Sequence, residues 1–319
     1  MPWLEYIIHT APGTTDAVSS ALTTAGFDDL VLEDQQELES FLDQNRAYWD
    51  YIDEKLQNQL QGLSQIKLYL EDTDTAGRDT LQALLEALKT ENNPLPLQIN
   101  TLEETNWEES WKDNYPPQEV GEKLVVLPCW RKDEDPHGRL PVILDPGLTF
   151  GTGAHPSTQM VMEAMEQLLT PGGSCLDLGS GSGILSIAAL RLGARSARGV
   201  DIDPKAEDIA RENALYNGFS SPEFTAYTGN VTADRTLMNT LQQEQYDLVL
   251  VNIVADVIIG LAPVLPAFLT TNSVLICSGI LDTRLREVEV ALEAAGLTVT
   301  SVRAKEDWRC VTAKRRSTL

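Results

Sequence analysis

The stretch Cys175–Leu185, CLDLGSGSGIL, decides the fold of this chain. An apolar strand with an acid at Asp177 leads into three alternate glycines, and a helical pattern follows. Glycine lets the backbone turn tightly and lets a ligand approach without a Cβ in the way. We therefore predict a ligand-binding loop at Gly179, Gly181 and Gly183. Its backbone N–H groups and the N-terminus of the next helix should face the ligand.

An acid at the end of the following strand supports this interpretation. Asp201 stands 22 residues beyond Gly179, where it is placed to accept hydrogen bonds from both hydroxyls of a ribose. A nicotinamide dinucleotide site competes, but its fingerprint is G-x-G-x-x-G, whereas the spacing here is G-x-G-x-G. A tight turn without any ligand is a third, minority possibility. The pattern resembles motif I of class I S-adenosylmethionine-dependent methyltransferases, in which Asp177 would lie near the positively charged amino-acid end of the cofactor.

Beyond the loop, strands and helices alternate from about residue 124 onward. Such alternation predicts a mainly parallel, doubly wound, Rossmann-like α/β sheet with helices on both faces. Asn252 ends one of these strands, at the sheet edge where ligands bind, and its carboxamide offers an oxygen and two N–H donors. A helix N-cap is the competing interpretation of Asn252. The expected strands are 174–178, 197–201, 246–251, 273–277, 297–303 and 308–314, and the expected helices are 158–169, 183–192, 204–217, 256–268 and 282–295.

The first hundred residues follow a different pattern, β-α-β-β-α-β, which is typical of a split, ferredoxin-like α+β domain. A short helix with Trp107 and Trp111 on one face then precedes two prolines. We predict a smaller N-terminal domain at 1–101, a linker helix at 102–117 and the Rossmann-like domain at 118–319. Within the first domain the expected strands are 3–10, 27–32, 65–70 and 96–101, and the expected helices are 14–25 and 80–89.

The chain is strongly acidic. Its 319 residues contain 24 Lys and Arg against 48 Asp and Glu, a net charge of −24 with a pI near 4.4. Such a field repels phosphate backbones, which argues against broad nucleic-acid binding and favours a basic partner. Residues 28–54 alone hold ten acids and one base. This segment is either a solvated face or a docking surface for a cationic protein.

Cysteine and histidine spacing bears on metal binding and on the compartment. The four cysteines form no C-x-x-C pair and the three histidines are scattered, so we expect no metal site. With no secretory leader, reduced thiols in a cytoplasmic protein are expected. The most apolar stretch, 247–269, is interrupted by polar residues and prolines and does not predict a membrane span.

Seven segments together resemble the bacterial methyltransferases of large-subunit ribosomal protein L11. The resemblance covers most of the chain from about residue 105, and the FGTG-x-HP-[ST]-T loop is its most specific part. Ala154 and Ser180 depart from the family's usual residues, but both are small and leave the cofactor site intact. The segments are WEESWK (107–112), LDPGLTFGTGAHPST (144–158), LDLGSGSGIL (176–185), GVDIDPKA (199–206), NIVA (252–255), SGIL (278–281) and KEDW (305–308).

This resemblance implies an S-adenosylmethionine-dependent protein N-methyltransferase. Its N-terminal lobe would recognise ribosomal protein L11, a basic acceptor, and its acceptor groups would be lysine side chains and/or the N-terminal α-amino group. From its position at a strand end, we hypothesise that Asn252 holds the neutral amine through its carboxamide oxygen. Neither a membrane nor direct contact with nucleic acid would be required. The residues that the resemblance implies for the site are Thr158, Gly179, Asp201, Asn252 and Phe150 at the cofactor and His155 at the substrate channel.

Three alternatives remain open at this point. The same catalytic lobe could methylate another protein amine or a small molecule. A non-catalytic module could have kept the fold, although intact glycines, Asp201 and Asn252 argue against it. A dinucleotide-dependent oxidoreductase is disfavoured by the glycine spacing.

Overall fold

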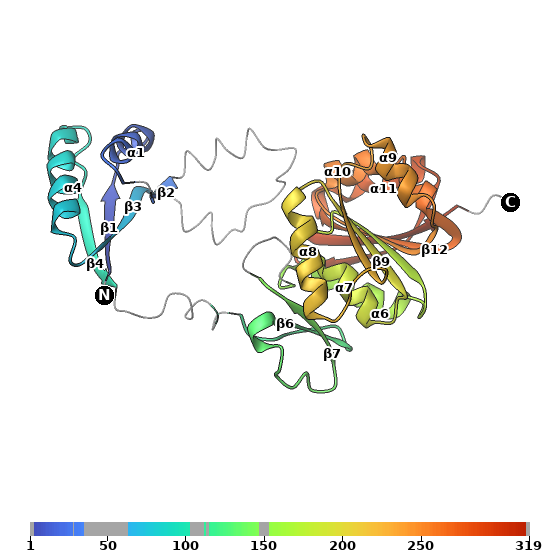
Figure 1. The fold of residues 1–319 in the computed structure, drawn as a ribbon. Helices are drawn as coiled ribbons and strands as arrows, with labels where there is room; N and C mark the ends of the chain where they lie inside the picture. Colours follow the sequence, from blue (N-terminus) through green and yellow to red (C-terminus); the bar gives the residue numbers. More distant parts are fainter. Residues whose placement is uncertain are drawn as a thin grey trace. The chain divides into compact units, whose positions relative to one another are not determined.

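The computed structural model describes residues 3–27, 29–34, 63–102, 112, 115–146 and 153–316. The chain divides into two compact units, Met1–Asn114 and Tyr115–Leu319 (Figure 1). The predicted linker helix at 102–117 lies largely outside the described residues, as does most of the acidic segment 28–54.

The described residues of the first unit follow the predicted β-α-β-β-α-β order and form an antiparallel sheet with the strand order β2-β3-β1-β4. Leu4, Tyr6 and Ile8 alternate along β1 and form one core with side chains of both helices. The second strand begins later than predicted. The second helix begins five residues earlier, because Asp74 caps it by accepting a hydrogen bond from the Gly77 N–H. The elements are β1 (Trp3–His9), α1 (Thr15–Thr24), β2 (Val31–Asp34), β3 (Ser64–Glu71), α4 (Thr75–Leu88) and β4 (Leu97–Leu102).

The second unit is built on a seven-stranded sheet with the order β10-β9-β8-β11-β12-β14-β13. Its strands are parallel from β10 to β12, and β14 and β13 complete it antiparallel. Figure 1 shows α9, α10 and α11 on one face and α6, α7 and α8 on the other, which confirms the doubly wound α/β class. The strands are β8 (Ser174–Leu178), β9 (Ser196–Asp201), β10 (Phe224–Thr228), β11 (Tyr246–Asn252), β12 (Leu269–Leu281), β13 (Leu297–Lys305) and β14 (Trp308–Arg315).

Helices and a small second sheet complete this unit. The sequence prediction missed β10 and α9. It also extended α10 too far, because Pro263 and Pro266 break the helix and a 3-10 turn follows at Leu265–Phe268. The helices are α6 (Pro156–Leu168), α7 (Ile184–Arg191), α8 (Pro204–Tyr216), α9 (Arg235–Leu241), α10 (Ala255–Leu261) and α11 (Leu285–Ala294), and the second sheet holds β5 (Gln118–Val120), β6 (Leu124–Pro128) and β7 (Leu140–Leu144).

None of the four cysteines forms a disulfide, and burial raises the pKa of the Cys175 and Cys277 thiols, which keeps them protonated. Within the described ranges, no three His, Cys, Asp or Glu side chains are grouped so that they could hold a metal ion. Likewise, no helix that the structure describes combines the length and the apolarity of a membrane span.

Candidate functional site

The glycine loop between β8 and α7 requires glycine at each of its three positions. Gly179, Gly181 and Gly183 have φ angles of 78°, 48° and 80°, in the left-handed region. Space is also short, since a Cβ on Gly179 would lie 3.1 Å from the Ile253 side chain and one on Gly183 would lie 3.0 Å from Ala210 Cβ. Larger residues would therefore both strain the turn and push its neighbours away.

The amides of this loop donate within the protein, which corrects the expectation that they face the ligand. Gly179 and Ser180 N–H both donate to Val200 O, at 2.8 and 3.1 Å. Gly181 N–H donates to Asp201 Oδ2 at 2.9 Å, and Gly183 N–H donates to Ser180 O at 2.8 Å. Since buried backbone donors need acceptors, the loop uses these four N–H groups to hold its own shape.

Asp201 ends β9 and keeps capacity for further hydrogen bonds. Its Oδ2 accepts from Gly181 N–H and its Oδ1 accepts from Asp203 N–H at 3.0 Å. A carboxylate has about four acceptor sites, so each oxygen can accept one more bond. The next residue, Ile202, exposes 64% of its surface. This exposed apolar side chain lies next to Asp201 in the chain, and no role was predicted for it from the sequence. An isoleucine between two aspartates was the signal that could have found it.

Asp177 is a fully buried carboxyl on β8 with one oxygen lacking a partner. Its Oδ2 accepts from Ser186 N–H at 3.1 Å and from Ser186 Oγ at 2.9 Å, whereas Oδ1 has no hydrogen-bond partner among the described residues. Burial raises the pKa of Asp177 to about 7, the Ser186 bonds oppose that rise, and the charge of Asp201 adds to it. A buried carboxyl oxygen without a partner is suited to a cationic group of a ligand.

Asn252 and Thr158 meet although they lie 94 residues apart in the chain. Asn252 Nδ2 donates to Oγ1 of the fully buried Thr158 at 3.1 Å, and its buried Oδ1 has no partner among the described residues. The N-cap of α10 is Val254, so the interpretation of Asn252 as a helix cap is wrong. This bond orients the carboxamide and leaves an oxygen that can accept from a ligand or an acceptor amine.

The backbone of the SGIL segment (278–281) packs against Ile253, the residue that follows Asn252. A Cβ on Gly279, whose φ is 81°, would lie 2.6 Å from Ile253 O, so the two backbones pack in direct contact. Ile253 N–H also donates to Ser278 O at 3.0 Å. Together with Gly179, which faces the Ile253 side chain, Gly279 fixes the end of β11 from two sides.

His155 has a structural role in the contacts that the structure describes. It is the N-cap of α6, where Nδ1 accepts from Ser157 N–H at 3.2 Å and lies 2.7 Å from Ser157 Oγ. Its ring packs edge-on against Trp308, with centroids 4.6 Å apart. The predicted place of His155 at the substrate channel stays a prediction. Phe150, the other predicted residue of this segment, lies outside the described residues.

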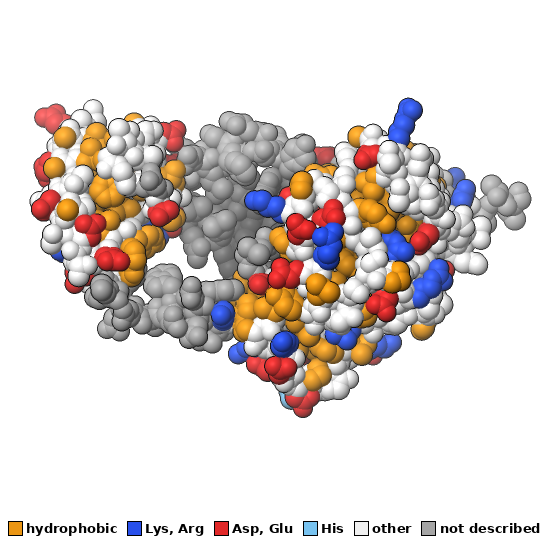
Figure 2. Space-filling model, viewed as in Figure 1, with side chains coloured by type: hydrophobic (Ala, Val, Ile, Leu, Met, Phe, Trp, Pro, Cys, Tyr) orange, Lys and Arg blue, Asp and Glu red, His pale blue; other side chains and the backbone are white. Residues whose placement is uncertain are grey.

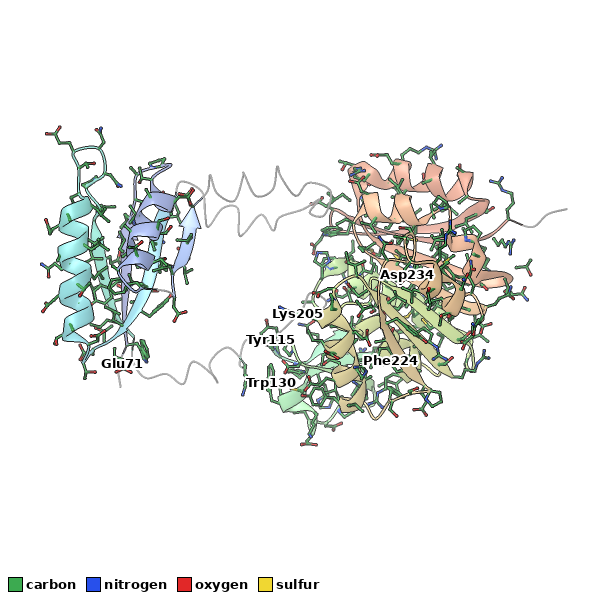
Figure 3. The ribbon with its side chains drawn as sticks, turned by 45° about the horizontal axis from the view of Figure 1, so that its top comes forward. Glu71, Tyr115, Trp130, Lys205, Phe224 and Asp234 are labelled. Atoms are coloured by element: carbon green, nitrogen blue, oxygen red, sulfur yellow. The ribbon has the colours of Figure 1, made fainter. Side chains whose placement is uncertain are left out.

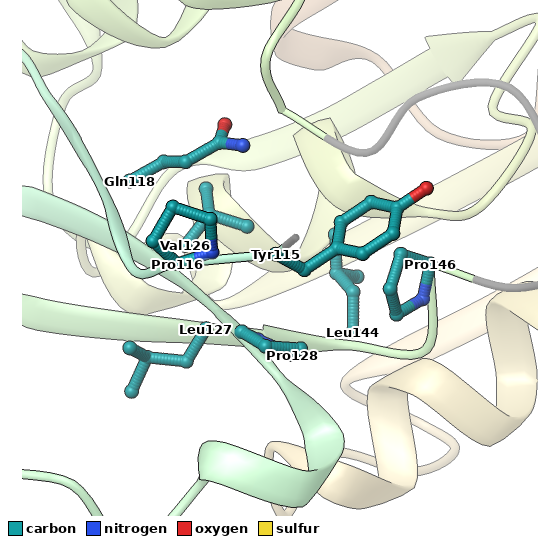
Figure 4. A pocket seen from close by; sticks show the side chains of 8 residues that line it. All are labelled: Tyr115, Pro116, Gln118, Val126, Leu127, Pro128, Leu144 and Pro146. Atoms are coloured by element: carbon teal, nitrogen blue, oxygen red, sulfur yellow. The ribbon is translucent and has the colours of Figure 1, made fainter. Parts of the chain in front are cut away.

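An apolar pocket lies at the start of the second unit, between Pro116 and the ends of β6 and β7 (Figure 4). Tyr115, which lines the pocket, packs edge-to-face against Trp130 with ring centroids 6.3 Å apart, and Figure 3 labels both residues. One wall is Val126, which a Cβ on Gly153 would approach to 3.0 Å. The pocket therefore borders the segment that leads to His155.

Known proteins match this chain over nearly its whole length. The family model described as "Ribosomal protein L11 methyltransferase (PrmA)" matches residues 2–316. Proteins named ribosomal protein L11 methyltransferase from Heliobacterium modesticaldum and Alkaliphilus oremlandii are each 33% identical, covering 99% and 98% of this chain and 98% and 99% of their own.

A solved structure agrees with the sequence relatives. The crystal structure of the ribosomal protein L11 methylase from Lactobacillus delbrueckii subsp. bulgaricus aligns with a TM-score of 0.57 and 30% identity, over 64% of this chain and all of that one. The glycine loop, the acid at the end of β9 and the Asn252–Thr158 pair are thus found in a chain that matches proteins named ribosomal protein L11 methyltransferase over nearly its whole length. The chain belongs to the ribosomal protein L11 methyltransferase family.

Proposed function

We propose that this protein transfers methyl groups from S-adenosylmethionine to amines of ribosomal protein L11, on lysine side chains and/or the N-terminal α-amino group. The observation that carries the proposal is the family match over residues 2–316, combined with two buried oxygens, Asp177 Oδ1 and Asn252 Oδ1, that have no partner in the described chain. Buried polar atoms are rarely left unpaired, so they favour a ligand with donor groups.

S-adenosylmethionine, when bound, supplies an electrophilic methyl group on a sulfonium. Asp201 would accept from its ribose hydroxyls and Asp177 would pair with its ammonium. Ile202 would offer apolar surface to its base. Thr158 and Gly179 would contact it as the family resemblance implies. These roles rest on the acceptor capacity, burial and exposure of the side chains described above.

Asn252 would position the acceptor amine. A lysine amine has a pKa near 10.4, so neutralising it at pH 7 costs about 4–5 kcal/mol. Desolvation in the site lowers this cost, and water takes the released proton. The Asn252 oxygen would then accept from an N–H of the neutral amine, leaving the nitrogen lone pair directed at the methyl group. Because Nδ2 of Asn252 is held by Thr158, the direction of that oxygen is fixed.

A labelling experiment with the full chain tests the function. S-adenosylmethionine with a labelled methyl group is incubated with the protein and purified L11, and then with all ribosomal proteins, and each labelled band is analysed by mass spectrometry. We expect label on L11 amines. Label on another protein or a small molecule, with none on L11, would overturn the acceptor but keep the transferase.

Asn252→Ala is expected to lower the rate of methyl transfer at least about 100-fold, because positioning supplies much of the catalytic effect. Asn272→Ala, at an exposed residue near the start of β12, is the matched control and should keep normal turnover. Near-normal turnover of Asn252→Ala would remove this residue from the mechanism.

The charge distribution supports a basic protein as the acceptor. Residues 1–102 hold 18 Asp and Glu against 5 Lys and Arg, a surplus of 13 negative charges in the first third of the chain. Figure 2 shows acidic side chains spread over this unit. A free, basic protein in the cytoplasm would be attracted to such a surface, and nucleic acid would be repelled.

A further inference from the structure

Helix α8 contains Asn213 and ends at the C-cap residue Asn217, and these two buried asparagines are 1% and 6% exposed. Burying a carboxamide is unfavourable unless its polar atoms are hydrogen-bonded. Asn217 meets this demand on β7, where its Oδ1 accepts from Ile143 N–H at 2.9 Å and its Nδ2 donates to Ile143 O at 2.7 Å. This is the pattern by which a strand pairs with its neighbour.

Asn213 continues that pairing one step further, at the residue that follows β7. Its Oδ1 accepts from Asp145 N–H at 2.9 Å, two residues beyond Ile143. Four residues of helix rise by about 6 Å, and two residues of strand advance by about 6.6 Å. Since β7 is the edge strand of its sheet, the two carboxamides of α8 take the place of the missing neighbouring strand.

The other half of the Asn213 carboxamide reaches the glycine loop. Its Nδ2 donates to Ser182 O at 2.8 Å, 31 residues away. One turn earlier on the same helix, Ala210 packs against Gly183 so closely that a Cβ there would be 3.0 Å away. Asn217 makes no bond to the loop, as its Nδ2 is used by Ile143 O and Asn213 O.

We propose that Asn213 is a positioning residue of the methyltransferase, which sets the spacing between the glycine loop at Ser182 and the end of β7 at Asp145. The family-specific segment 144–158 continues from that end of β7, so one carboxamide connects the two segments that would surround the cofactor. Asn213 acts through these backbones and does not touch the cofactor. The inference rests on the proposed function.

Two substitutions at Asn213 test whether its two hydrogen bonds affect cofactor binding beyond any general loss of stability. Asn213→Asp keeps an acceptor for Asp145 N–H but loses the donor and sets a carboxylate oxygen against Ser182 O. Asn213→Ala removes both bonds without adding charge, and serves if the aspartate variant does not fold. Asn217→Ala is the matched control at the C-cap of α8, since it removes bonds to Ile143, Asn213 O and Arg191 but none to the glycine loop.

The experiment measures the Kd of S-adenosylhomocysteine by calorimetry, the Tm, and KM and kcat with L11. We expect both Asn213 variants to raise this Kd and the KM for S-adenosylmethionine about tenfold, which corresponds to about 1.4 kcal/mol. At saturating donor, kcat should stay within about threefold. Asn217→Ala should lower the Tm about as much as the Asn213 variants do, but it should leave the Kd of S-adenosylhomocysteine within about twofold of the wild-type value.

Two results would overturn the assignment. One is an unchanged Kd in the folded Asn213 variants. The other is an equal loss of affinity in Asn217→Ala, which would indicate a merely structural helix face. Failure of the wild-type chain to bind S-adenosylhomocysteine would instead overturn the proposed function, and this assignment with it.

Discussion

The buried carboxyl of Asp177 should make the protein less stable as the pH rises. Its pKa is raised by burial from an ordinary 3.8 to about 7. Below pH 3.8 the group is protonated in both the folded and the unfolded chain. Between pH 3.8 and 7 the unfolded chain releases a proton that the folded chain retains, so the free energy of unfolding falls. Above pH 7 both states are ionised and the loss stays constant.

The size of this effect follows from the two pKa values. A difference of about 3 pH units, at about 1.4 kcal/mol for each, amounts to at most roughly 4 kcal/mol. Asp177→Asn removes the titration, and the penalty for its unpaired amide is independent of pH. The free energy of unfolding of this variant minus that of the wild type should therefore increase from pH 4.5 to pH 8 by several kcal/mol.

Urea titrations at half-unit pH steps, followed by circular dichroism, measure this difference. The same variant should bind S-adenosylhomocysteine more weakly, because the ligand's ammonium loses its charged partner. Relative to the wild type, the variant would thus gain stability as the pH rises, although it binds S-adenosylhomocysteine more weakly. A stability difference that stays flat between pH 4.5 and 8 would refute the reasoning. Equal affinity of the two chains at pH 8 would refute the assignment of Asp177 to the ammonium.

Three further predictions concern the sugar site, the β11 end and the partner. Asp201→Ala should raise the Kd of S-adenosylhomocysteine by about 100-fold through lost charge-assisted hydrogen bonds, and Asp203→Ala, which removes only the α8 cap, is the calorimetric control. Gly279→Ala should lower the urea-derived free energy of unfolding by about 1–3 kcal/mol more than Gly296→Ala, which shares its positive φ but faces open space. Binding to L11 should weaken between 0.1 and 1 M salt, as the Debye length falls from about 10 to 3 Å; a flat titration would contradict electrostatic docking.

Local patterns predicted the elements that place the site. The strand–glycine–helix order at Cys175–Leu185 and the polar residues at strand ends put Asp201 and Asn252 at one edge of the sheet, because the carboxyl ends of parallel strands meet there. Strand β10 was missed because FTAYT is short and only weakly alternating, and its parallel pairing with β9 comes from tertiary structure.

The hydrogen bonds of the site were harder to predict than its location. The loop amides bind Val200 and Asp201, and Asn213 binds Ser182 and Asp145, which lie far away in sequence. Periodicity reports which face of an element is buried, but it carries no information on which distant carbonyl a side chain meets.

The self-contained hydrogen bonding of the glycine loop affects how the protein would meet its small ligand. The N–H groups of Gly179, Ser180 and Gly181 already donate to Val200 and Asp201, so the loop has its shape before a ligand binds. A preorganised binding site loses little conformational entropy when the ligand binds. Exchange of the used ligand for a fresh one after each turnover would then require no refolding of this segment.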